Sequence, residues 1–293
     1  MEKEHGPRKG GPRPGEKMPW QGIPRDMEPV VQRFSQHRFE TADGHQMTYS
    51  LFEPEHAPGE KLPMVVFMHD MGACSADAKR TLTQGIGALV WAQEAEQKKR
   101  PCYVLAPQYE DKAAFDDFTV GWEAEATVEL IRHVSGSHDV DERRIYGTGQ
   151  SMGTMMLCEL LIRHDDVFAA CYLTAGQWDP ARMAAIRDRN VWIMVSEGDG
   201  RAFPIMGECM EAVEAAGGRV ARGHVSAKAT DEEFTVFASD VLAQGARVQF
   251  TWLDGESVLE PDTPRFPAAC HVHTWKWAYR IEPVRAWLFE QRL

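Results

Sequence analysis

A serine between two glycines lies at the centre of the most informative stretch of the sequence, residues 144–153, which is RIYGTGQSMG. The stretch contains G-x-S-x-G, with Ser151 between Gly149 and Gly153. An apolar run that predicts a strand comes before it, and a segment with helical composition follows. In such a strand–turn–helix the serine adopts a strained backbone conformation, and small flanking residues keep strand and helix from colliding. The arrangement favours nucleophilic attack by Ser151 on an ester carbonyl.

The same glycines permit a second interpretation. Gly147, Gly149 and Gly153 after a strand approach a dinucleotide-binding fingerprint. That fingerprint normally occupies the first βα unit and is followed by an acidic residue at the end of the second strand, whereas this motif lies in mid-chain. Asp165 and Asp166, at a suitable distance, fall at a helix end. Dinucleotide binding is therefore the alternative of a different functional class.

Further polar residues follow other predicted strands. His69 and Asp70 come after one apolar run, Asp199 follows another, and His271 and His273 lie beyond a long loop after the last. Because the carboxyl ends of parallel strands meet at one edge of a sheet, these residues can gather there. Serine, aspartate and histidine in this chain order form a known type of catalytic triad.

The elements that must position these residues alternate between strand and helix. The continuous apolar run 63–68 is typical of a strand buried on both faces. The predicted strands are 37–41, 46–53, 63–68, 102–106, 144–147, 169–174, 191–196 and 248–253, and the predicted helices are 81–98, 121–134, the segment after Ser151, 204–216 and 275–291. This order predicts an α/β fold with a mostly parallel sheet, an antiparallel hairpin at its N-terminal end and helices on both faces.

Taken together, residues 36–292 resemble the α/β-hydrolase esterases of the poly(3-hydroxybutyrate)-depolymerase-like, feruloyl-esterase-like and predicted-peptidase group. The similarity rests on H-D-M-G at 69–72, RIY leading into GQSMG, W-D-P at 178–180, E-G-D at 197–199, and His271 ahead of Trp275. It implies Ser151 as nucleophile, Asp199 as acid and His271 as base, with no metal or organic cofactor. Backbone amides of Met152 and of Met71 would stabilise the oxyanion. Many relatives have glycine where this chain has Asp70, so that side chain would narrow the oxyanion loop or add a polar contact.

Three other residues compete for these roles. His273 is the alternative base, in a pair with His271 that would also suit a metal, although no carboxylate or cysteine cluster accompanies it. Glu197 and Asp254 are alternative acids. Asp199 is favoured because it lies just beyond the end of its predicted strand, from where a carboxylate can reach the histidine.

Substrate preference is predicted from the segments expected near the site. Only sixteen residues separate the strands ending at 174 and starting at 191, which leaves no room for a large cap domain there. The extra material at 217–245 is expected to form an excursion near the site. The pocket candidates are Asp70, Gln108, Trp178, Phe203 and Trp275, with core packing as the alternative for each aromatic residue. An uncapped, aromatic-lined cleft suits aryl or other bulky acyl esters, and peptide hydrolysis is the alternative.

Composition limits the partners, the domain organisation and the location that are expected. The net charge of −12 argues against nucleic acid or an anionic membrane as a partner, and it leaves oligomeric state open. Residues 1–30, rich in proline and glycine, predict a flexible arm ahead of a catalytic domain at 31–293. No signal peptide is recognisable, and six cysteines without paired spacing indicate buried free thiols, so a cytoplasmic location is expected.

Overall fold

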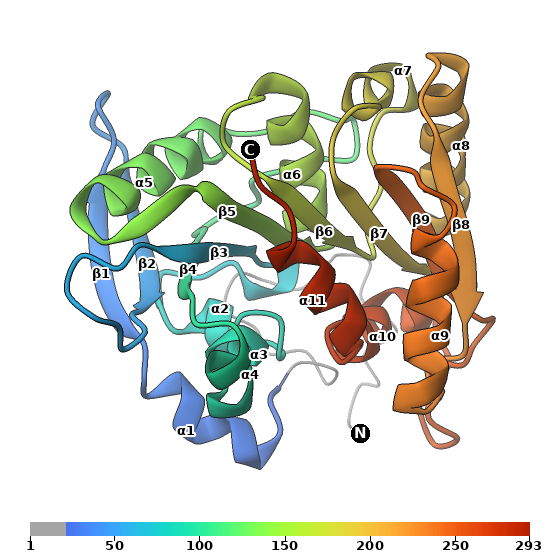
Figure 1. Ribbon diagram of the computed structural model, residues 1–293, viewed down its shortest axis with the longest axis horizontal. Helices are drawn as coiled ribbons and strands as arrows, with labels where there is room; N and C mark the ends of the chain where they lie inside the picture. Colours follow the sequence, from blue (N-terminus) through green and yellow to red (C-terminus); the bar gives the residue numbers. More distant parts are fainter. Residues whose placement is uncertain (1–21) are drawn as a thin grey trace, which may run out of the picture.

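A single nine-stranded sheet forms the centre of the part of the chain that the computed structural model describes, residues 22–293. The strand order is β1-β2-β4-β3-β5-β6-β7-β9-β8 (Figure 1). The β1–β2 and β2–β4 pairs are antiparallel, and every other pair is parallel. The strands are β1 (Ser35–Glu40), β2 (Gln46–Phe52), β3 (Leu62–Met68), β4 (Tyr103–Gln108), β5 (Val140–Gln150), β6 (Ala170–Thr174), β7 (Val191–Ser196), β8 (Val220–Val225) and β9 (Val248–Leu253).

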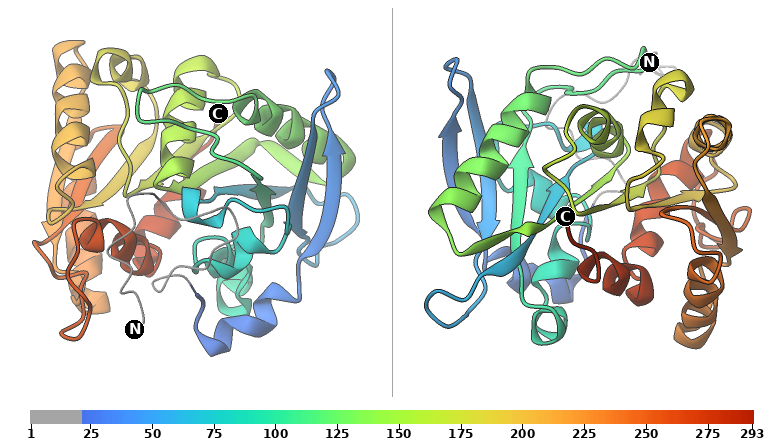
Figure 2. Two further views of the ribbon diagram at one scale, coloured as in Figure 1. Left: turned by 180° about the vertical axis from the view of Figure 1, so that it is seen from behind. Right: turned by 45° about the horizontal axis from the view of Figure 1, so that its top comes forward.

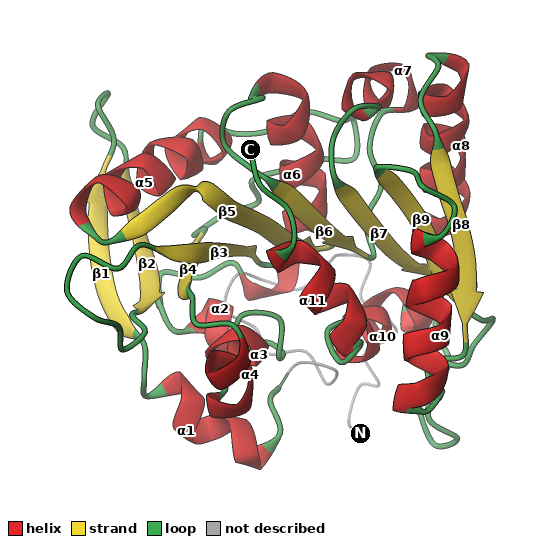
Figure 3. Cartoon of the chain, viewed as in Figure 1, coloured by secondary structure: helices red, strands yellow, loops and turns green. Residues whose placement is uncertain are grey.

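Helices cover both faces of this sheet, as Figures 1 and 3 show. One face carries α5 (Glu123–Ser137), α6 (Met152–Arg163), α7 (Pro180–Met183) and α8 (Ala202–Ala215). The other carries α1 (Glu28–Val31), α2 (Arg80–Thr83), α3 (Leu89–Ala92), α4 (Glu94–Lys99), α9 (Asp231–Leu242), α10 (Ala269–Ala278) and α11 (Glu282–Phe289). The turned views in Figure 2 separate the two layers. Among these helices, none has the length and apolar composition needed to cross a lipid bilayer.

The core divides into two clusters, one on each face of the sheet. Alternate residues of β3 enter different clusters: Met64 and Val66 pack with α5 and α6, whereas Val65 and Phe67 pack with α3 and α10. This alternation explains why the strand is apolar at every position. The six cysteines are buried and free, in agreement with the sequence expectation.

The predicted α/β-hydrolase fold is confirmed, but two long helices are interrupted. The helix expected at 81–98 is three short helices, because Gly85 and Gly87 weaken it and Gly87 fits against Phe67 with no space for a side chain. The closing helix expected at 275–291 is α10 and α11. Pro283 lacks the amide that would continue the helix and disfavours helical backbone just before it.

The segment 217–245 is not the expected excursion near the site. It forms β8, which pairs with β9 at the edge of the sheet, and α9, whose N-terminus has a capping box between Thr230 and Glu233. This βα unit extends the sheet instead of covering its carboxyl edge.

Two short helical elements begin within residues 1–30, the predicted N-terminal arm. Its first 21 residues lie outside the described part of the chain, but a 3₁₀ turn (Arg25–Met27) and α1 lie within the expected arm. Met27 and Val30 are buried in the core cluster of that face. The boundary predicted at residue 30 therefore falls inside a packed helix.

Candidate active site

Ser151 occupies the sharp turn between β5 and α6. Its φ of 52° and ψ of −114° place a non-glycine residue in strained backbone, as predicted for a nucleophile at this position. A Cβ atom on Gly149 would lie 2.7 Å from the carbonyl carbon of Gly153, and one on Gly153 would collide with the carbonyl group of Met68. The two glycines therefore allow β3, β5 and α6 to approach closely enough to form the turn.

The His271 imidazole joins Ser151 to a buried carboxylate. Its Nε2 lies 2.8 Å from the Ser151 Oγ, and its Nδ1 lies 2.6 Å from the Asp199 Oδ2. His271 is the third residue of α10, which begins before the predicted start at residue 275, so the helix fixes the position of the ring. The ring meets the Trp275 indole edge-on, one turn further along, at a centroid distance of 5.6 Å. With Nδ1–H donating to Asp199, Nε2 is free to accept the serine proton.

Asp199 is held from both sides between β7 and α8. Its Oδ1 accepts hydrogen bonds from the amides of Arg201 and Ala202, at 3.1 and 3.0 Å, while Oδ2 faces His271. Burial acts to raise the pKa of Asp199, but the hydrogen bond and charge of His271 and these two amides together lower it. The carboxylate is therefore ionised at neutral pH and orients the imidazole.

The alternative base and the two alternative acids make their contacts elsewhere. His273 lies in a separate cavity along α10. Glu197 accepts a hydrogen bond from the Gly255 amide, and Asp254 contacts His224 at 2.7 Å. None of the three takes part in the hydrogen-bonded chain of Ser151, His271 and Asp199.

Two backbone amides next to Ser151 are available to a ligand. Met71 and Met152 both line the cavity that contains Ser151. Within residues 22–293, neither amide donates a hydrogen bond to a protein acceptor. Met152 is the first residue of α6, where the helix leaves amides unsatisfied and favours negative charge. Both were the predicted oxyanion donors.

Asp70 holds the backbone of the loop after β3 and does not line the cavity of Ser151. Its Oδ1 accepts from the Gly72 amide at 2.7 Å, and its Oδ2 accepts from the side chain of Gln150 at 2.9 Å. Burial raises the pKa of Asp70 despite these two hydrogen bonds. An aspartate at this position was expected either to narrow the loop or to add a polar contact. The polar contact is present, but its partners are protein groups, so Asp70 is not a pocket residue.

The adjacent His69 has a structural role, because both of its ring nitrogens bond the protein backbone. Its Nδ1 bonds the carbonyl of Asp70 at 2.7 Å, and its Nε2 accepts from the Tyr109 amide at 2.9 Å. Burial lowers the pKa of His69 to about 4. The ring is therefore neutral at pH 7.

The cavity around Ser151 has a volume of about 590 Å³, within the range of small-molecule sites. Its lining residues are Met71, Lys112, Ala114, Asp116, Ser151, Met152, Met155, Gln177, Asp199, Gly200, Arg201, Pro267, Ala268 and His271. No residue of the segment 217–245 is among them.

The prediction that aromatic side chains line the cavity of Ser151 is wrong. Trp178 is fully buried and donates to Glu159, Phe203 packs on Phe250 and Trp252, and Trp275 lies behind His271 facing a different cavity. Gln108 does not line the cavity of Ser151 either, and its side chain bonds the backbone at Ala73 and Thr81. Of these four side chains, Gln108 holds the segment after β3, and the three aromatic side chains pack against helices and strands.

Several residues that line the cavity were not identified from the sequence. Met155 is one helical turn after Ser151, so helical periodicity could have identified it. Lys112 and Asp116 belong to the loop that follows β4 at the carboxyl edge of the sheet, where site residues are expected. The ion pair between Arg201 and Asp116, at 3.0 Å, joins two loops distant in sequence and had no local signal.

The glycines of the alternative dinucleotide motif are enclosed by protein. A Cβ atom on Gly147 would lie 2.6 Å from Leu157 and 2.8 Å from the Cys171 sulfur. Gly149 and Gly153 face each other and Met68, as described above. Because protein atoms fill the space beside all three, the glycines serve packing, and no room remains there for a pyrophosphate.

Comparison with known proteins agrees with this architecture. The family described as esterase PHB depolymerase matches residues 47–206. No curated protein gives a significant match to the sequence. Among solved structures, a thermostable esterase has a TM-score of 0.68 at 24% identity, covering 90% of this chain and 64% of that one, so this chain spans less than two thirds of that protein's length. A ferulic acid esterase (TM-score 0.50, 14% identity, 85% and 98% covered) and an S-formylglutathione hydrolase from Staphylococcus aureus (0.53, 11%, 87% and 98%) share the fold.

Proposed function

The chain belongs to the PHB depolymerase family of esterases, and from this premise we propose that it is a serine carboxylic-ester hydrolase in which Ser151, His271 and Asp199 carry out the reaction. One observation carries the assignment of residues. The Ser151 hydroxyl, both nitrogens of His271 and the Asp199 carboxylate form an uninterrupted hydrogen-bonded chain at the wall of a cavity. Three side chains more than 40 residues apart in sequence meet in the order that nucleophile, base and orienting acid require.

The proposed reaction proceeds through an acyl-enzyme. His271 Nε2 takes the proton of Ser151 as Oγ attacks the ester carbonyl carbon, and Asp199 stabilises the resulting imidazolium. The imidazolium then protonates the leaving alcohol oxygen as the ester bond breaks. Water, deprotonated by His271, attacks the acyl-enzyme, and the proton returns to Ser151 as the carboxylic acid leaves.

The free amides of Met71 and Met152 are the proposed oxyanion donors. Each such donor contributes about 3 kcal/mol to stabilising the transition state, because it is oriented before the charge develops. The short 3₁₀ turn at Met71–Ala73 positions the first amide, and Asp70 caps that turn. The second amide is fixed by the start of α6.

For substrate, we propose an ester with a bulky or aryl acyl group. The volume of about 590 Å³ accommodates such a group. Aromatic side chains do not supply the walls, but Met71, Met152 and Met155 do, and methionine sulfur makes favourable contacts with aromatic rings. Methionine is also flexible enough to fit different acyl groups.

Hydrolysis of a substrate panel by purified protein tests the proposal. The panel contains p-nitrophenyl acetate, a longer p-nitrophenyl ester, a hydroxycinnamate ester and a blocked peptide amide. We expect ester turnover, and we expect Ser151→Ala to lower kcat by about 10⁴-fold or more. Ser239→Ala, at an exposed position of α9, is the matched control and should retain full activity.

A fluorophosphonate reagent provides the covalent test. It should label the native protein at Ser151 and leave the Ser151→Ala variant unlabelled. Unchanged turnover in that variant would refute the nucleophile assignment. Turnover of the peptide amide in preference to every ester would refute the ester assignment while leaving the nucleophile intact.

A further inference from the structure

A buried amide opens on the cavity of Ser151 without a hydrogen-bond partner in the protein for its oxygen. Gln177 follows β6 at the carboxyl edge of the sheet, lines this cavity and is 5% exposed. Within residues 22–293, its Oε1 accepts no hydrogen bond, and its Nε2 makes one weak contact, 4.0 Å from the Met155 sulfur. Buried amides are normally paired, because an unpaired one costs free energy. The proposed reaction makes no use of this side chain.

The segment that carries Gln177 is packed against the nucleophile. A Cβ atom on the preceding Gly176 would lie 3.1 Å from the Ser151 carbonyl oxygen and 2.4 Å from the Thr154 Cγ2, so the segment after β6 is in contact with the start of α6. Met155, whose sulfur the amide of Gln177 contacts, donates its own backbone amide to the Ser151 carbonyl at 3.0 Å. The Gln177 amide therefore lies beside the first turn of α6, on the wall of the cavity nearest to that helix.

Strained backbone holds this segment in place. Within residues 22–293, the non-glycine residues with positive φ are Ser151, Ala175 and Phe118, at 52°, 46° and 62°. Ala175 lies two residues before Gln177. Phe118 packs edge-on against Trp178, the residue after Gln177, at a centroid distance of 5.8 Å. Strain of this kind gathers where function requires a fixed conformation, and here two of the three strained residues fix the position of one buried amide.

The charged groups that line the same cavity are engaged elsewhere or lie at its exposed side. Arg201 pairs with Asp116 at 3.0 Å, and Asp199 belongs to the hydrogen-bonded chain of the proposed reaction. Lys112 makes no ion pair within residues 22–293, but it is partly exposed, and its Nζ lies 5.3 Å from the centre of the exposed Phe115 ring. The buried polar group that is left to bind a ligand is therefore an uncharged amide.

This amide offers a ligand a donor and an acceptor side by side. One N–H of Gln177 meets the Met155 sulfur, which leaves the second N–H and the Oε1 available. An amide on the ligand matches both, because its own carbonyl and N–H form two parallel hydrogen bonds with them. A ketone, an ether or a carboxylate lacks the donor. A hydroxyl places its donor and its acceptor on one oxygen, so it satisfies only one of the two with good geometry.

We propose that Gln177 determines specificity by pairing with an uncharged amide on the acyl group of the substrate. The inference rests on the proposed function, because it identifies which esters the same site hydrolyses. Since His271 must protonate the leaving alcohol, the alcohol lies beside α10, and the acyl group is left to the wall of α6 that Gln177 adjoins. At about 30 Å³ per water-sized group, the cavity of about 590 Å³ holds about twenty non-hydrogen atoms, enough for an aryl acyl group with a carboxamide.

A series of esters of matched shape tests the proposal. Methyl esters of phenylacetic acid and of 3-phenylpropanoic acid carry a para carbamoyl, acetyl, isopropenyl or carboxylate group, and the saturated spacer isolates the ester carbonyl from the electronic effect of that group. At the chain length that is hydrolysed faster, kcat/KM for the carbamoyl ester should exceed that for the isopropenyl ester at least about tenfold, because the apolar group leaves the buried amide unpaired. The acetyl ester, which only accepts, should lie between them.

Variants assign this preference to one side chain. Gln177→Met removes the donor and the acceptor at similar volume, so it should bring the carbamoyl and isopropenyl esters within about threefold of each other. Gln32→Met, at the exposed C-terminal end of α1, is the matched control and should keep the native ratio. Thermal melting establishes that each variant is folded before its kinetics are measured.

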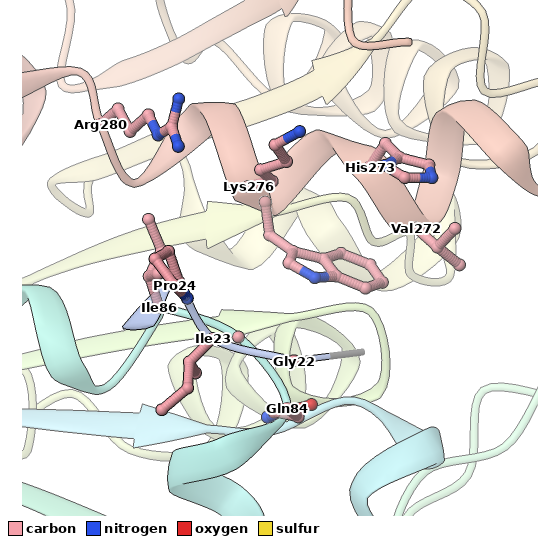
Figure 4. Close-up of a pocket in the computed structure, with 11 residues that line it drawn as sticks. Gly22, Ile23, Pro24, Gln84, Ile86, Val272, His273, Lys276 and Arg280 are labelled. Carbon is pink, nitrogen blue, oxygen red and sulfur yellow. The ribbon is translucent and has the colours of Figure 1, made fainter. Parts of the chain in front are cut away.

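Binding to the Ser151→Ala variant is measured without turnover. Calorimetry should give a dissociation constant for the carbamoyl ester at least about tenfold below that for the isopropenyl ester, and the Met155 methyl signal should shift on binding. The methyl signals of Ile23 and Ile86, which line the separate cavity along α10, should stay unchanged (Figure 4). If this binding is found but the native protein hydrolyses none of the esters, the hydrolase assignment fails and the pairing with Gln177 stands.

Three outcomes would overturn the proposal. The first is equal use and equal binding of the carbamoyl and isopropenyl esters by protein with Gln177 intact. The second is a preference for the carbamoyl ester that persists in folded Gln177→Met. The third is a preference for the carboxylate ester that Lys112→Gln removes, which would assign specificity to the cation in place of the amide.

Discussion

The carboxylate of Asp70 accepts a hydrogen bond of 2.9 Å from the side chain of Gln150, the residue immediately before Ser151. The same carboxylate caps the turn that carries the Met71 amide. One buried acid therefore connects the two backbone segments from which the proposed oxyanion donors come.

Replacing Asp70 should separate the effect of its hydrogen bonds from that of its charge. Asp70→Ala leaves the Gly72 amide and the Gln150 side chain without their acceptor, so we expect a loss of about 2–4 kcal/mol in the free energy of unfolding. Asp70→Asn keeps an acceptor for Gly72 and removes a charge whose burial is unfavourable, so its stability at pH 7 should be within about 1 kcal/mol of the native protein. Urea denaturation measures both. Equal losses in the two variants would show that the charge itself is required.

Substituting glycines tests the close packing behind Ser151. Gly153→Ala places a Cβ against the Met68 carbonyl, so we expect a loss of about 3 kcal/mol or more and a fall in activity from displacement of Ser151. Gly207→Ala is the matched control, since Gly207 lies within α8 with open space around its Cβ position. That variant should gain about 0.5–1 kcal/mol in stability from helix propensity. Calorimetric melting distinguishes the two, and a stable, active Gly153→Ala variant would contradict the packing argument.

The buried His69 predicts a loss of stability in mild acid. Its folded pKa of about 4 is below the ordinary value of 6.5 because of burial, so the unfolded chain binds the proton more readily between these two values. The free energy of unfolding should therefore fall as pH falls from about 6.5 to about 4, by about 3 kcal/mol from this group. Asp70, whose folded pKa burial raises, acts in the opposite direction, because its protonation favours the folded state.

Two measurements assign this acid effect to His69. In nuclear magnetic resonance titrations of the native protein, the His69 ring signals should show no protonation above about pH 5. In denaturation at several pH values, His69→Gln should show a shallower dependence on pH than the native protein. An ordinary histidine titration near pH 6.5 would refute the prediction.

The two histidines of α10 should respond differently to removal. His271→Ala should lower kcat/KM by about 10³-fold or more, because nucleophile, base and acid act as a unit. His273→Ala should stay within about threefold of the native value, since His273 lines the separate cavity along α10 and takes no part in the hydrogen bonds of Ser151. Steady-state kinetics with a p-nitrophenyl ester measures both variants. The reverse result would transfer the role of base to His273.

Local sequence was sufficient wherever function depends on a short segment. The G-x-S-x-G motif predicted the strained turn at Ser151, because only small residues fit where β3, β5 and α6 meet. Alternation of apolar strands and helices predicted the parallel sheet, and the order of its carboxyl ends predicted that Ser151, Asp199 and His271 would gather at one edge. These inferences depend on backbone sterics and on burial of apolar side chains, which act over a few residues.

Only the tertiary structure decided what surrounds the nucleophile. Trp178 and Trp275 are of a residue type common in pockets and lie in segments near the site. Trp178 nevertheless bonds the buried Glu159, and Trp275 packs against His271. Part of the cavity wall instead comes from Lys112, Asp116 and Arg201, on loops whose approach depends on the packing of distant elements. Whether an aromatic side chain enters a cleft or the core depends on the direction of its Cβ and on the space left by neighbours far away in sequence. Neither quantity is encoded within a short segment, so residue type and local spacing alone could not predict the cavity wall.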